Sequence, residues 1–397
     1  MPNSPKGVDV NLIHRREYEL KKTKEKIPVI LAKAPGRIHF LGGHCSPYCN
    51  IFLSAAIDRY IQVAVSPRKD NSLRYYAADF GERKRTTISN LKYRREDRWS
   101  NYFKTAVYVF IELGYPVKGL NFTISGNIPK QIGLASSSAI EVAAATALKG
   151  LFNLKIADIE LASRLAQAHF IIFGKHPELA DYITGICAKK DQFLLIDEAD
   201  HSIKRFKSPF LRCKIILLDS GISRSSGNGE LAVRRGELKS ALKLLSKEGI
   251  GINFRELAEA KPAEVTGNLP EELRRRTLHV IQEIRRIPEA GNCLANADLQ
   301  GFAKEIFHSH ESLRDLYELS CPEIDWMVKR ASETEGAFGA RMTGNGFGCC
   351  TYVVVKNEAL YEFNGKIDDY ERIFGFHPSV YEVKLATGSH IVKKGGK

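Results

Sequence analysis

Short apolar runs alternate with longer amphipathic stretches along most of the chain. The short runs are rich in branched and aromatic residues, as β-strands are, and they lie at 28–32, 61–65, 120–124, 193–196, 214–218 and 350–355. Two longer stretches, at 139–152 and 159–173, carry apolar residues at helical spacing. This alternation predicts a mixed chain of helices and strands.

A polar segment at 197–209 separates two different halves of this pattern. Strands and helices interleave before it, whereas the helical patterns at 230–245 and 271–286 dominate after it. A chain of 397 residues is also longer than most single compact domains. We therefore expect a charged N-terminal arm at 1–27, a first domain at 28–205 and a second domain at 206–397.

The composition favours a cytoplasmic protein with reduced thiols. Hydrophobic residues make up 44% of the chain, enough for a substantial core, and no apolar run is long enough to cross a bilayer. The eight cysteines are scattered, and the first residues lack the basic-then-apolar order of a signal peptide. Cys45 and Cys49 have no second pair of matching spacing, so the pattern favours buried thiols over a zinc site.

The formal net charge of +13 is compatible with a nucleic acid, an anionic surface or an acidic small ligand. Much of the excess lies in short runs at 21–26, 83–85, 274–276 and 393–397, and none of these runs has interleaved aromatic residues on which bases could stack. The runs therefore favour solvated surfaces, and we expect neither a nucleic-acid partner nor a membrane partner.

A serine-rich turn precedes an alanine-rich helical stretch. The segment 129–139 reads Pro-Lys-Gln-Ile-Gly-Leu-Ala-Ser-Ser-Ser-Ala and leads from a strand end into that helix. Free N–H groups and the positive end of a helix favour an anion at such a turn. Ser136, Ser137 and Ser138 could cap the helix, or they could bind phosphate oxygens and a magnesium ion. The turn is not a Walker motif, because no Gly-Lys-Ser/Thr ends it.

The stretch Gly-Leu-Ala-Ser-Ser-Ser-Ala-Ile-Glu-Val-Ala at 133–143 resembles the central phosphate motif of the galactokinase, homoserine kinase, mevalonate kinase and phosphomevalonate kinase (GHMP) superfamily. The segments 34–42 and 339–348 resemble its first and third motifs, in the same order. The resemblance implies a two-domain α+β architecture with a ribosomal-protein-S5-like α/β N-terminal domain, a ferredoxin-like C-terminal domain and an active site in the cleft between them. It also implies ATP and magnesium as cofactors, with the nucleotide phosphates bound by Gly133, Leu134, Ala135, Ser136, Ser137 and Ser138.

Within this superfamily, the segments 275–283 and 309–323 are similar to the galactokinase branch. Their charged residues could also form an ordinary helix face with i,i+4 pairs, but a helix face predicts no particular order of residues. The resemblance implies a sugar 1-kinase that transfers phosphate from ATP to a sugar or sugar-like hydroxyl.

In galactokinases an aspartate accepts the hydroxyl proton, helped by the arginine of the first motif, which matches Arg37 here. The family's Gly-Ile-Met-Asp-Gln has a superficial match at 185–192, and this match would make Asp191 the base. A register without gaps, anchored on the strand-like run at 193–196, instead places Asp181 at the aspartate. We therefore assign Arg37 and Asp181 as the catalytic residues and keep Asp191 as the alternative base.

The resemblance makes Ser137 a magnesium ligand. The same ungapped register places His169 where galactokinases carry a glutamate that helps to hold magnesium. Magnesium prefers oxygen ligands to imidazole. His169 could therefore mark an altered metal site, or it could be a hydrogen-bonded core histidine.

The sugar-binding positions depart from the galactokinase pattern. By resemblance they are Gly43, His44, Ser46, Leu231, Gly344 and Gly346. Galactokinases carry Gly-Glu-His-Thr-Asp-Tyr where this chain has Gly-Gly-His-Cys-Ser-Pro at 42–47, and Leu231 stands in place of a sugar-contacting tyrosine. Only His44 is kept. Because a site built around hydroxyl partners discriminates strongly when those partners are lost, we expect galactose to bind poorly.

Two functions remain after these comparisons of residues. The first is an active kinase for an altered sugar or polyol, and the second is a catalytically impaired relative that binds nucleotide or sugar as a sensor. Arg37, the serine turn at 136–138 and Asp181 favour the first function. The departures from the family pattern favour a changed or inactive site, and they lie at Gly43, Ser46, His169 and Leu231. The oligomeric state stays open.

Overall fold

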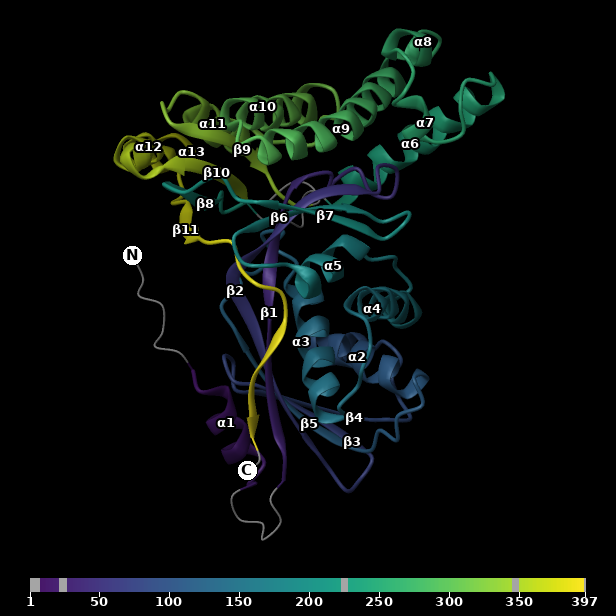
Figure 1. The fold of residues 1–397 in the computed structure, drawn as a ribbon, viewed down its shortest axis with the longest axis vertical. Helices are drawn as coiled ribbons and strands as arrows, with labels where there is room; N and C mark the ends of the chain where they lie inside the picture. Colours follow the sequence, from purple (N-terminus) through teal and green to yellow (C-terminus); the bar gives the residue numbers. More distant parts are fainter. Residues whose placement is uncertain (1–7, 21–26, 223–227, 345–349, 396–397) are drawn as a thin grey trace.

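The computed structural model describes residues 8–20, 27–222, 228–344 and 350–395, which form two β-sheets with helices packed on each (Figure 1). The first elements along the chain are α1 (Val10–Glu17), β1 (Val29–Leu41), β2 (Ile51–Pro67), β3 (Ser72–Ala77), β4 (Glu82–Thr87), the 3₁₀ helix η1 (Arg95–Ser100), α2 (Asn101–Glu112), β5 (Leu120–Gly126), α3 (Ser136–Leu151), α4 (Asp158–Phe173), α5 (Leu179–Cys187), β6 (Gln192–Asp197) and β7 (Ser202–Lys207).

The remaining elements are β8 (Cys213–Asp219), α6 (Asn228–Lys247), α7 (Phe254–Leu257), α8 (Pro262–Thr266), α9 (Glu271–Ala295), α10 (Leu299–Asp315), α11 (Pro322–Ser332), β9 (Ala337–Met342), β10 (Thr351–Lys356), the 3₁₀ helix η3 (Asn357–Ala359), α12 (Leu360–Ile367), α13 (Asp369–Phe374), β11 (Ser379–Val383) and β12 (His390–Gly395). Each strand-like or helical run predicted from the sequence coincides with one of these elements or overlaps it. The mixed α+β prediction is confirmed.

The first sheet has the strand order β12-β1-β2-β5-β3-β4, with β6 paired to β2 and β7 paired to β6. Its neighbouring strands are antiparallel except for β3 and β5, which run parallel. Helix α3 packs against β1 and β2, and α1 packs on β2 and β5 at the other side of the sheet (Figure 1). The long strand β1 therefore spans the core of this half of the molecule.

Alanine explains why α3 can lie so close to the sheet. The stretch 139–148 is almost entirely buried, and five of its ten residues are alanine. Small side chains allow a helix backbone to approach β1 and β2 closely, and alanine also has the highest helix propensity. The packing of α3 on β1 and β2 thus fixes the position of its first turn, which begins at Ser136.

The second sheet has the antiparallel order β11-β8-β10-β9. Helices α9, α10 and α11 lie above it at the top of Figure 1, and α10 and α11 contact β9 directly. A second apolar cluster, which includes Leu218, Met327 and Phe363, fills the space on the side of α11 and α12. The strands of this second sheet lie between Cys213 and Val383.

The ends of the chain both return to the first sheet. The expected boundary near residue 205 falls inside β7, and β8 opens the second sheet. The last strand, β12, then pairs with β1, so the end of the chain lies in the first sheet and not with the rest of 206–397. The N-terminal arm contains α1, whose buried His14 contacts Thr123 Oγ1 and Ser66 Oγ at 2.9 Å each.

Among the helices of the described residues, none combines the length and the apolar character that a membrane span needs.

Candidate active site

The serine turn ends in a helix start that no side chain caps. Gln131, Gly133 and Ala135 all have positive φ, so the chain turns sharply three times before α3. Ala135 occupies the N-cap position and offers no side-chain oxygen to the first N–H groups of the helix. Those N–H groups and the half-buried hydroxyls of Ser136 and Ser137 are therefore available to an anion.

Two backbone hydrogen bonds fix this turn in place. The N–H of Arg37 on β1 donates to the carbonyl of Leu134 at 3.2 Å. The N–H of Cys350, next to β10, donates to the carbonyl of Ile132 at 3.2 Å. The turn thus lies between the first sheet and the second sheet.

The guanidinium of Arg37 connects this turn to α5. Arg37 is 4% exposed, so a charged group of this kind needs partners on several sides. Its Nε donates to Asp181 Oδ1 at 2.6 Å, and one terminal nitrogen donates to the Gly133 carbonyl at 2.5 Å. The other terminal nitrogen lies 3.8 Å from Glu178 Oε2.

Asp181 lies in the first turn of α5, where three donors reach its carboxylate. Besides Arg37, these are His39 Nε2 at 2.9 Å from Oδ1 and the Ser138 hydroxyl at 3.3 Å from Oδ2. Burial alone would raise the pKa of Asp181, but Arg37 and His39 outweigh it and hold the pKa well below its usual range. An ionised carboxylate beside a phosphate-type turn can accept a proton from a bound hydroxyl.

Asp191, the alternative base, lies elsewhere. It is exposed, has a φ of 56° and directly precedes β6. The structure therefore brings Arg37, Asp181 and the serine turn together, as the ungapped register predicts, and leaves Asp191 out.

His169, on α4, contacts a buried carboxylate. Its Nδ1 lies 2.7 Å from Glu141 Oε1, and the Tyr182 hydroxyl donates to Glu141 Oε2 at 2.7 Å. Glu141 is fully buried, and this burial raises the pKa of its carboxyl despite the two hydrogen bonds. The ring of His169 also stacks on Phe173, with 4.3 Å between the ring centroids. His169 is thus a half-buried histidine hydrogen-bonded to a core carboxylate.

The residues assigned to the sugar differ in their exposure to solvent and in their contacts. Gly43, His44 and Gly344 are buried, and Ser46 is half-buried with its carbonyl accepting from Arg235 Nε at 2.9 Å. Leu231 lies near the start of α6 and belongs to the apolar core. Gly346 lies outside the described residues.

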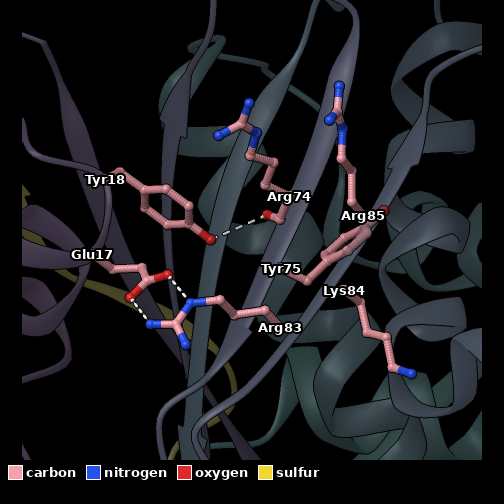
Figure 2. A pocket seen from close by; sticks show the side chains of 7 residues that line it. All are labelled: Glu17, Tyr18, Arg74, Tyr75, Arg83, Lys84 and Arg85. Atoms are coloured by element: carbon pink, nitrogen blue, oxygen red, sulfur yellow. Dashed lines mark hydrogen bonds and ion pairs between the residues drawn. The ribbon is translucent and has the colours of Figure 1, made fainter.

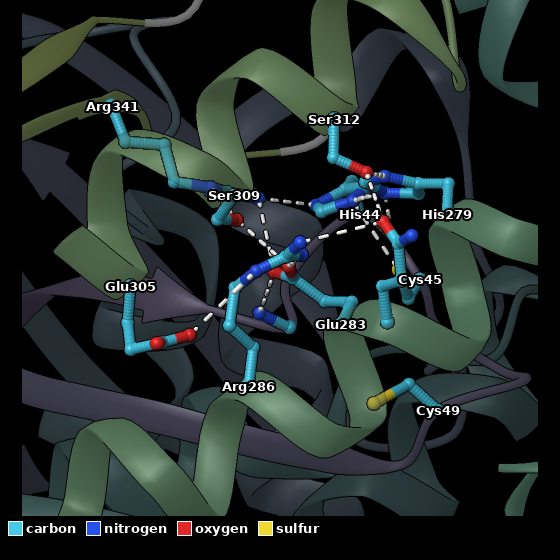
Figure 3. Close-up of polar contacts among 12 residues, drawn as sticks. His44, Cys45, Cys49, His279, Glu283, Arg286, Glu305, Ser309, Ser312 and Arg341 are labelled. Carbon is cyan, nitrogen blue, oxygen red and sulfur yellow. Dashed lines mark hydrogen bonds and ion pairs between the residues drawn. The ribbon is translucent and has the colours of Figure 1, made fainter.

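His44 belongs to a buried chain of hydrogen bonds (Figure 3). Arg341 lies 2.7 Å from His44 Nδ1, and since a guanidinium can only donate, the hydrogen of this ring is on Nε2. Nε2 then donates to His279 Nε2 at 2.6 Å, and His279 Nδ1 donates to Ser312 Oγ at 2.8 Å. Burial lowers the pKa of His279 to about 3 and that of His44 well below its ordinary value, so both rings are neutral. Both ring nitrogens of His44 thus have partners inside the protein.

The thiol of Cys45 lies close to this pair of rings. Its Sγ is 3.2 Å from His44 Nε2 and 3.8 Å from His279 Nε2, an arrangement that resembles a metal donor set. A metal on His44 Nε2 would place the hydrogen on Nδ1, where it would face the donor of Arg341. Burial also raises the pKa of the Cys45 thiol well above its usual value, which disfavours a thiolate. The donor set does not fit a metal ion.

Glu283 on α9 connects the first motif to the second half of the molecule (Figure 3). Its Oε1 accepts from the N–H of Gly42 at 3.1 Å, and its Oε2 accepts from the Ser309 hydroxyl at 2.7 Å. Arg341 lies 3.4 Å from Oε1. The loop that begins at Gly42 is therefore held by groups from α9, α10 and β9.

Two residues of the site are not among those assigned from the sequence. His39 follows Arg37 by two positions on β1, and Glu178 precedes Asp181 by three positions along the chain. Side chains two apart on a strand share a face, so the position of His39 beside Arg37 could have identified it. Glu178 is the N-cap residue of α5, a position where a side chain usually caps its own helix.

A separate surface pocket of about 350 Å³ lies between α1 and the β3–β4 hairpin (Figure 2). Glu17 makes two contacts of 2.6 Å with Arg83 at this pocket. Part of the basic run at 83–85 is thus neutralised within the chain. The pocket shares no residue with the site around Asp181.

Comparisons with known proteins agree with this geometry. Residues 101–187 match the GHMP kinases N terminal domain, and residues 292–362 match the GHMP kinases C terminal domain. The chain is 33% identical over 371 residues to a putative galactokinase of Treponema pallidum, covering 92% of this chain and 93% of the relative. It is 30% identical to the galactokinase of Thermotoga maritima, covering 90% of this chain and 98% of the relative.

Solved structures show the same fold. The galactokinase of Lactococcus lactis in complex with galactose superposes with a TM-score of 0.87 at 24% identity, covering 96% of this chain and 99% of that one. The mevalonate kinase of Methanococcus jannaschii superposes with a TM-score of 0.63 at 19% identity, covering 92% and 100%. The two-domain architecture implied by the sequence motifs is confirmed.

The fold and the site define a small-molecule kinase of the GHMP class. The chain belongs to the galactokinase-like branch of the GHMP kinases, and it is an ATP-dependent sugar kinase.

Proposed function

We propose that this chain phosphorylates the anomeric hydroxyl of a sugar, or a hydroxyl of a similar polyol, and that D-galactose is not its best acceptor. The observation that carries the proposal is the 2.6 Å contact between Arg37 Nε and Asp181 Oδ1 beside the uncapped start of α3. A phosphate turn, a buried cation and an ionised carboxylate in contact are the parts that phosphoryl transfer to a hydroxyl needs.

In the proposed reaction the sugar hydroxyl attacks the γ-phosphorus of ATP, the bond from this phosphorus to the β,γ-bridging oxygen breaks, and ADP leaves. Asp181 accepts the proton that the hydroxyl loses. Arg37 contacts both Asp181 and the Gly133 carbonyl of the phosphate turn. Its positive charge can therefore stabilise the phosphoryl group during transfer from ATP to the sugar hydroxyl.

The start of α3 is the proposed site for the nucleotide phosphates and for magnesium. Ser136 and Ser137 are half-buried hydroxyls at a helix start whose N-cap, Ala135, has no side-chain oxygen. Hydroxyl oxygen is the type of ligand that magnesium prefers, and Ser137 is the proposed ligand. Bound magnesium would neutralise part of the phosphate charge. His169 is already paired with Glu141, which supports a site that relies on Ser137 and the ATP phosphates.

The proposal that galactose is a poor acceptor is supported by the packing around Gly43. A Cβ added at Gly43 would lie 3.2 Å from both Cβ and Cδ2 of His39, closer than ordinary contact. The ring of His39 therefore takes space that the family's glutamate at this position would need. Leu231 also supports the proposal, because an apolar side chain stands where galactokinases carry a sugar-contacting tyrosine.

The experiment is ATP turnover across a panel of sugars, uronic acids, amino sugars and cyclitols in the presence of magnesium. We expect at least one acceptor with a kcat/KM clearly above that of D-galactose. Galactose as the best acceptor by a wide margin would contradict the specificity part of the proposal. Mg-ATP binding without turnover on any member of the panel would favour the nucleotide-sensor function instead.

A further inference from the structure

The imidazole of His39 lies between two carboxylates. The ring is fully buried, and its Nε2 is 2.9 Å from Asp181 Oδ1 and 3.4 Å from Glu178 Oε2. An ionised carboxylate can accept a hydrogen bond but cannot donate one. The ring nitrogen that faces the two carboxylates, Nε2, must therefore carry a hydrogen.

The other ring nitrogen supports the same tautomer. His39 Nδ1 is buried and has no hydrogen-bond partner among the residues that the structure describes. A hydrogen on Nδ1 would be a buried donor without an acceptor, which costs free energy. A buried nitrogen without a hydrogen costs less free energy when it lacks a partner. His39 therefore donates from Nε2 to Asp181.

Glu178 lies beside the His39 ring and does not cap its own helix. It is the N-cap residue of α5, but its side chain makes no capping hydrogen bond. Instead, Glu198 accepts from the N–H of Ala180 at 2.7 Å and caps the helix. Neither carboxylate oxygen of Glu178 has a hydrogen-bond partner among the described residues, and its nearest cationic or donor groups are Arg37 and His39.

The result is an asymmetric environment for the two oxygens of Asp181. Oδ1 accepts from Arg37 Nε at 2.6 Å and from His39 Nε2 at 2.9 Å. Oδ2 has only the Ser138 hydroxyl, at the longer distance of 3.3 Å. Two strong donors fix one edge of the carboxylate and leave the lone pairs of the other edge available.

We propose that His39 is a positioning residue for Asp181: its Nε2–H fixes Oδ1, so that Oδ2 receives the proton from the sugar hydroxyl. This inference rests on the proposed function, because it assigns an orientation to the proton acceptor of that reaction. Besides Arg37 and His39, the titratable groups around Asp181 are Glu178 and Tyr182 on the α5 segment, Glu141 on α3 and Glu198 after β6.

Two substitutions relative to the galactokinase motifs make this arrangement compatible with the fold. The glutamate of the first motif is Gly43 here, which leaves room for the His39 ring. In the register that places Asp181 at the aspartate of Gly-Ile-Met-Asp-Gln, the glycine of that motif is Glu178. Relative to the galactokinase motifs, a carboxylate is lost at Gly43 and another is gained at Glu178, and both positions are next to His39.

The first test is the tautomer of His39, measured by NMR of protein with ¹⁵N-labelled imidazoles. The chain has 11 histidines, and the His39 signals are those lost in His39→Gln. We expect a protonated Nε2 and an unprotonated Nδ1, and we expect both Asp181→Asn and Glu178→Gln to shift the Nε2–H resonance. Asp191→Asn is the matched control and should leave it unchanged, since Asp191 is exposed and lies outside the site. A hydrogen on Nδ1, or an Nε2 resonance that ignores Asp181→Asn, would overturn the inference.

The second test is kinetic and uses Mg-ATP with D-galactose and with the panel sugar of highest kcat/KM. Loss of a positioning group should lower kcat by about 10-fold to 100-fold in His39→Ala and change the acceptor KM by less than about threefold. His39→Gln keeps an N–H donor near the position of Nε2 and should recover most of kcat. Full kcat in His39→Ala, or equally low kcat in both variants, would contradict the positioning role.

The two tests separate this inference from the function on which it rests. The NMR measurement needs no turnover. If the wild-type protein transfers phosphate to no acceptor of the panel, the proposed function is wrong, and the role of His39 is wrong with it. Normal turnover together with the wrong tautomer would end the role of His39 alone.

Discussion

The half-buried His169 pairs with the buried Glu141: Nδ1 of the imidazole lies 2.7 Å from Oε1 of the carboxylate. Glu141 is fully buried on α3 and has a second hydrogen bond from the Tyr182 hydroxyl. An imidazole at this position therefore satisfies a carboxylate in the core behind the serine turn. The pair has a structural role that can be measured without any ligand.

We expect His169→Ala to lower the free energy of unfolding by about 1–3 kcal/mol, because it leaves a buried carboxylate oxygen without its partner. The measurement is urea denaturation at neutral pH. The matched control is His176→Ala, which removes an exposed histidine that stacks on Phe170 and should change stability by less than about 0.5 kcal/mol. Equal effects of the two substitutions would contradict the role of the pair.

Mg-ATP should raise the melting temperature of the protein, because a ligand that binds only the folded state stabilises it by mass action. Ser137→Ala removes the proposed magnesium ligand and should reduce this shift. A tenfold weaker Kd corresponds to a loss of about 1.4 kcal/mol of ligand stabilisation at saturating nucleotide. Ser246→Ala, at an exposed position of α6, is the control and should keep the full shift. An unchanged melting temperature of the intact protein in millimolar Mg-ATP would count against both the kinase and the sensor.

Asp181→Asn should lower turnover by about a hundredfold or more, since it removes the positioned proton acceptor. Nucleotide binding should persist, because the start of α3 is unchanged. The two observables are kcat with the best acceptor of the panel and the thermal shift in Mg-ATP. Asp191→Asn serves as the control and should retain wild-type kcat. Full activity in Asp181→Asn would show that another group accepts the proton.

The contact between Gly43 and His39 predicts coupling between these two positions. Gly43→Ala would place a Cβ 3.2 Å from the His39 ring, and we expect a loss of about 1–3 kcal/mol of stability from this overpacking. His39→Ala in the same protein should recover part of the loss, which a double-mutant cycle measures. Gly236→Ala meets nothing within 4 Å and should stabilise α6 slightly. Strictly additive changes in stability at positions 43 and 39 would mean that the His39 ring moves away from the added Cβ without a loss of free energy.

Local patterns and ordered motifs predicted the elements of the fold and the meeting of Arg37, Asp181 and the serine turn. These features depend on periodicity and on residues that stand in a recognisable order. The pairing of β12 with β1 was not predicted, because it joins segments more than 350 residues apart and no local signal marks it. The contact of His39 with Asp181 was also not predicted, although a signal existed, because His39 lies two residues from Arg37 on the same face of β1.

His44 shows how a correct match can still leave the contacts of a residue unknown. The sequence assigned it to the sugar, and that assignment stays a prediction. In the structure its Nδ1 and Nε2 are engaged by Arg341 and His279, which lie 297 and 235 residues away along the chain. Those partners could be named only once the second half of the molecule was in place around the first motif.

The carboxyl of Glu198 predicts a dependence of stability on pH. Burial raises the pKa of Glu198 to about 7, with the charges of Glu178 and Asp181 acting in the same direction and the N–H of Ala180 opposing them. An unfolded glutamate has a pKa of about 4.3, so between about pH 4.5 and pH 7 the folded state binds more protons than the unfolded state. The contribution of Glu198 to stability is therefore greatest at low pH and falls as the pH rises, until it levels off above about pH 7.

Glu198→Gln isolates this effect, because glutamine keeps an oxygen for the N–H of Ala180 but cannot ionise. Urea denaturation of both proteins at pH 5 and pH 8 gives the difference in their free energies of unfolding at each pH, and other titrating groups largely cancel in that difference. On going from pH 5 to pH 8 we expect the variant to gain on the order of 2 kcal/mol relative to the wild type, after allowance for partial solvent screening. A difference that stays constant over this range, or that changes in favour of the wild type, would mean that Glu198 is ionised in the folded protein throughout.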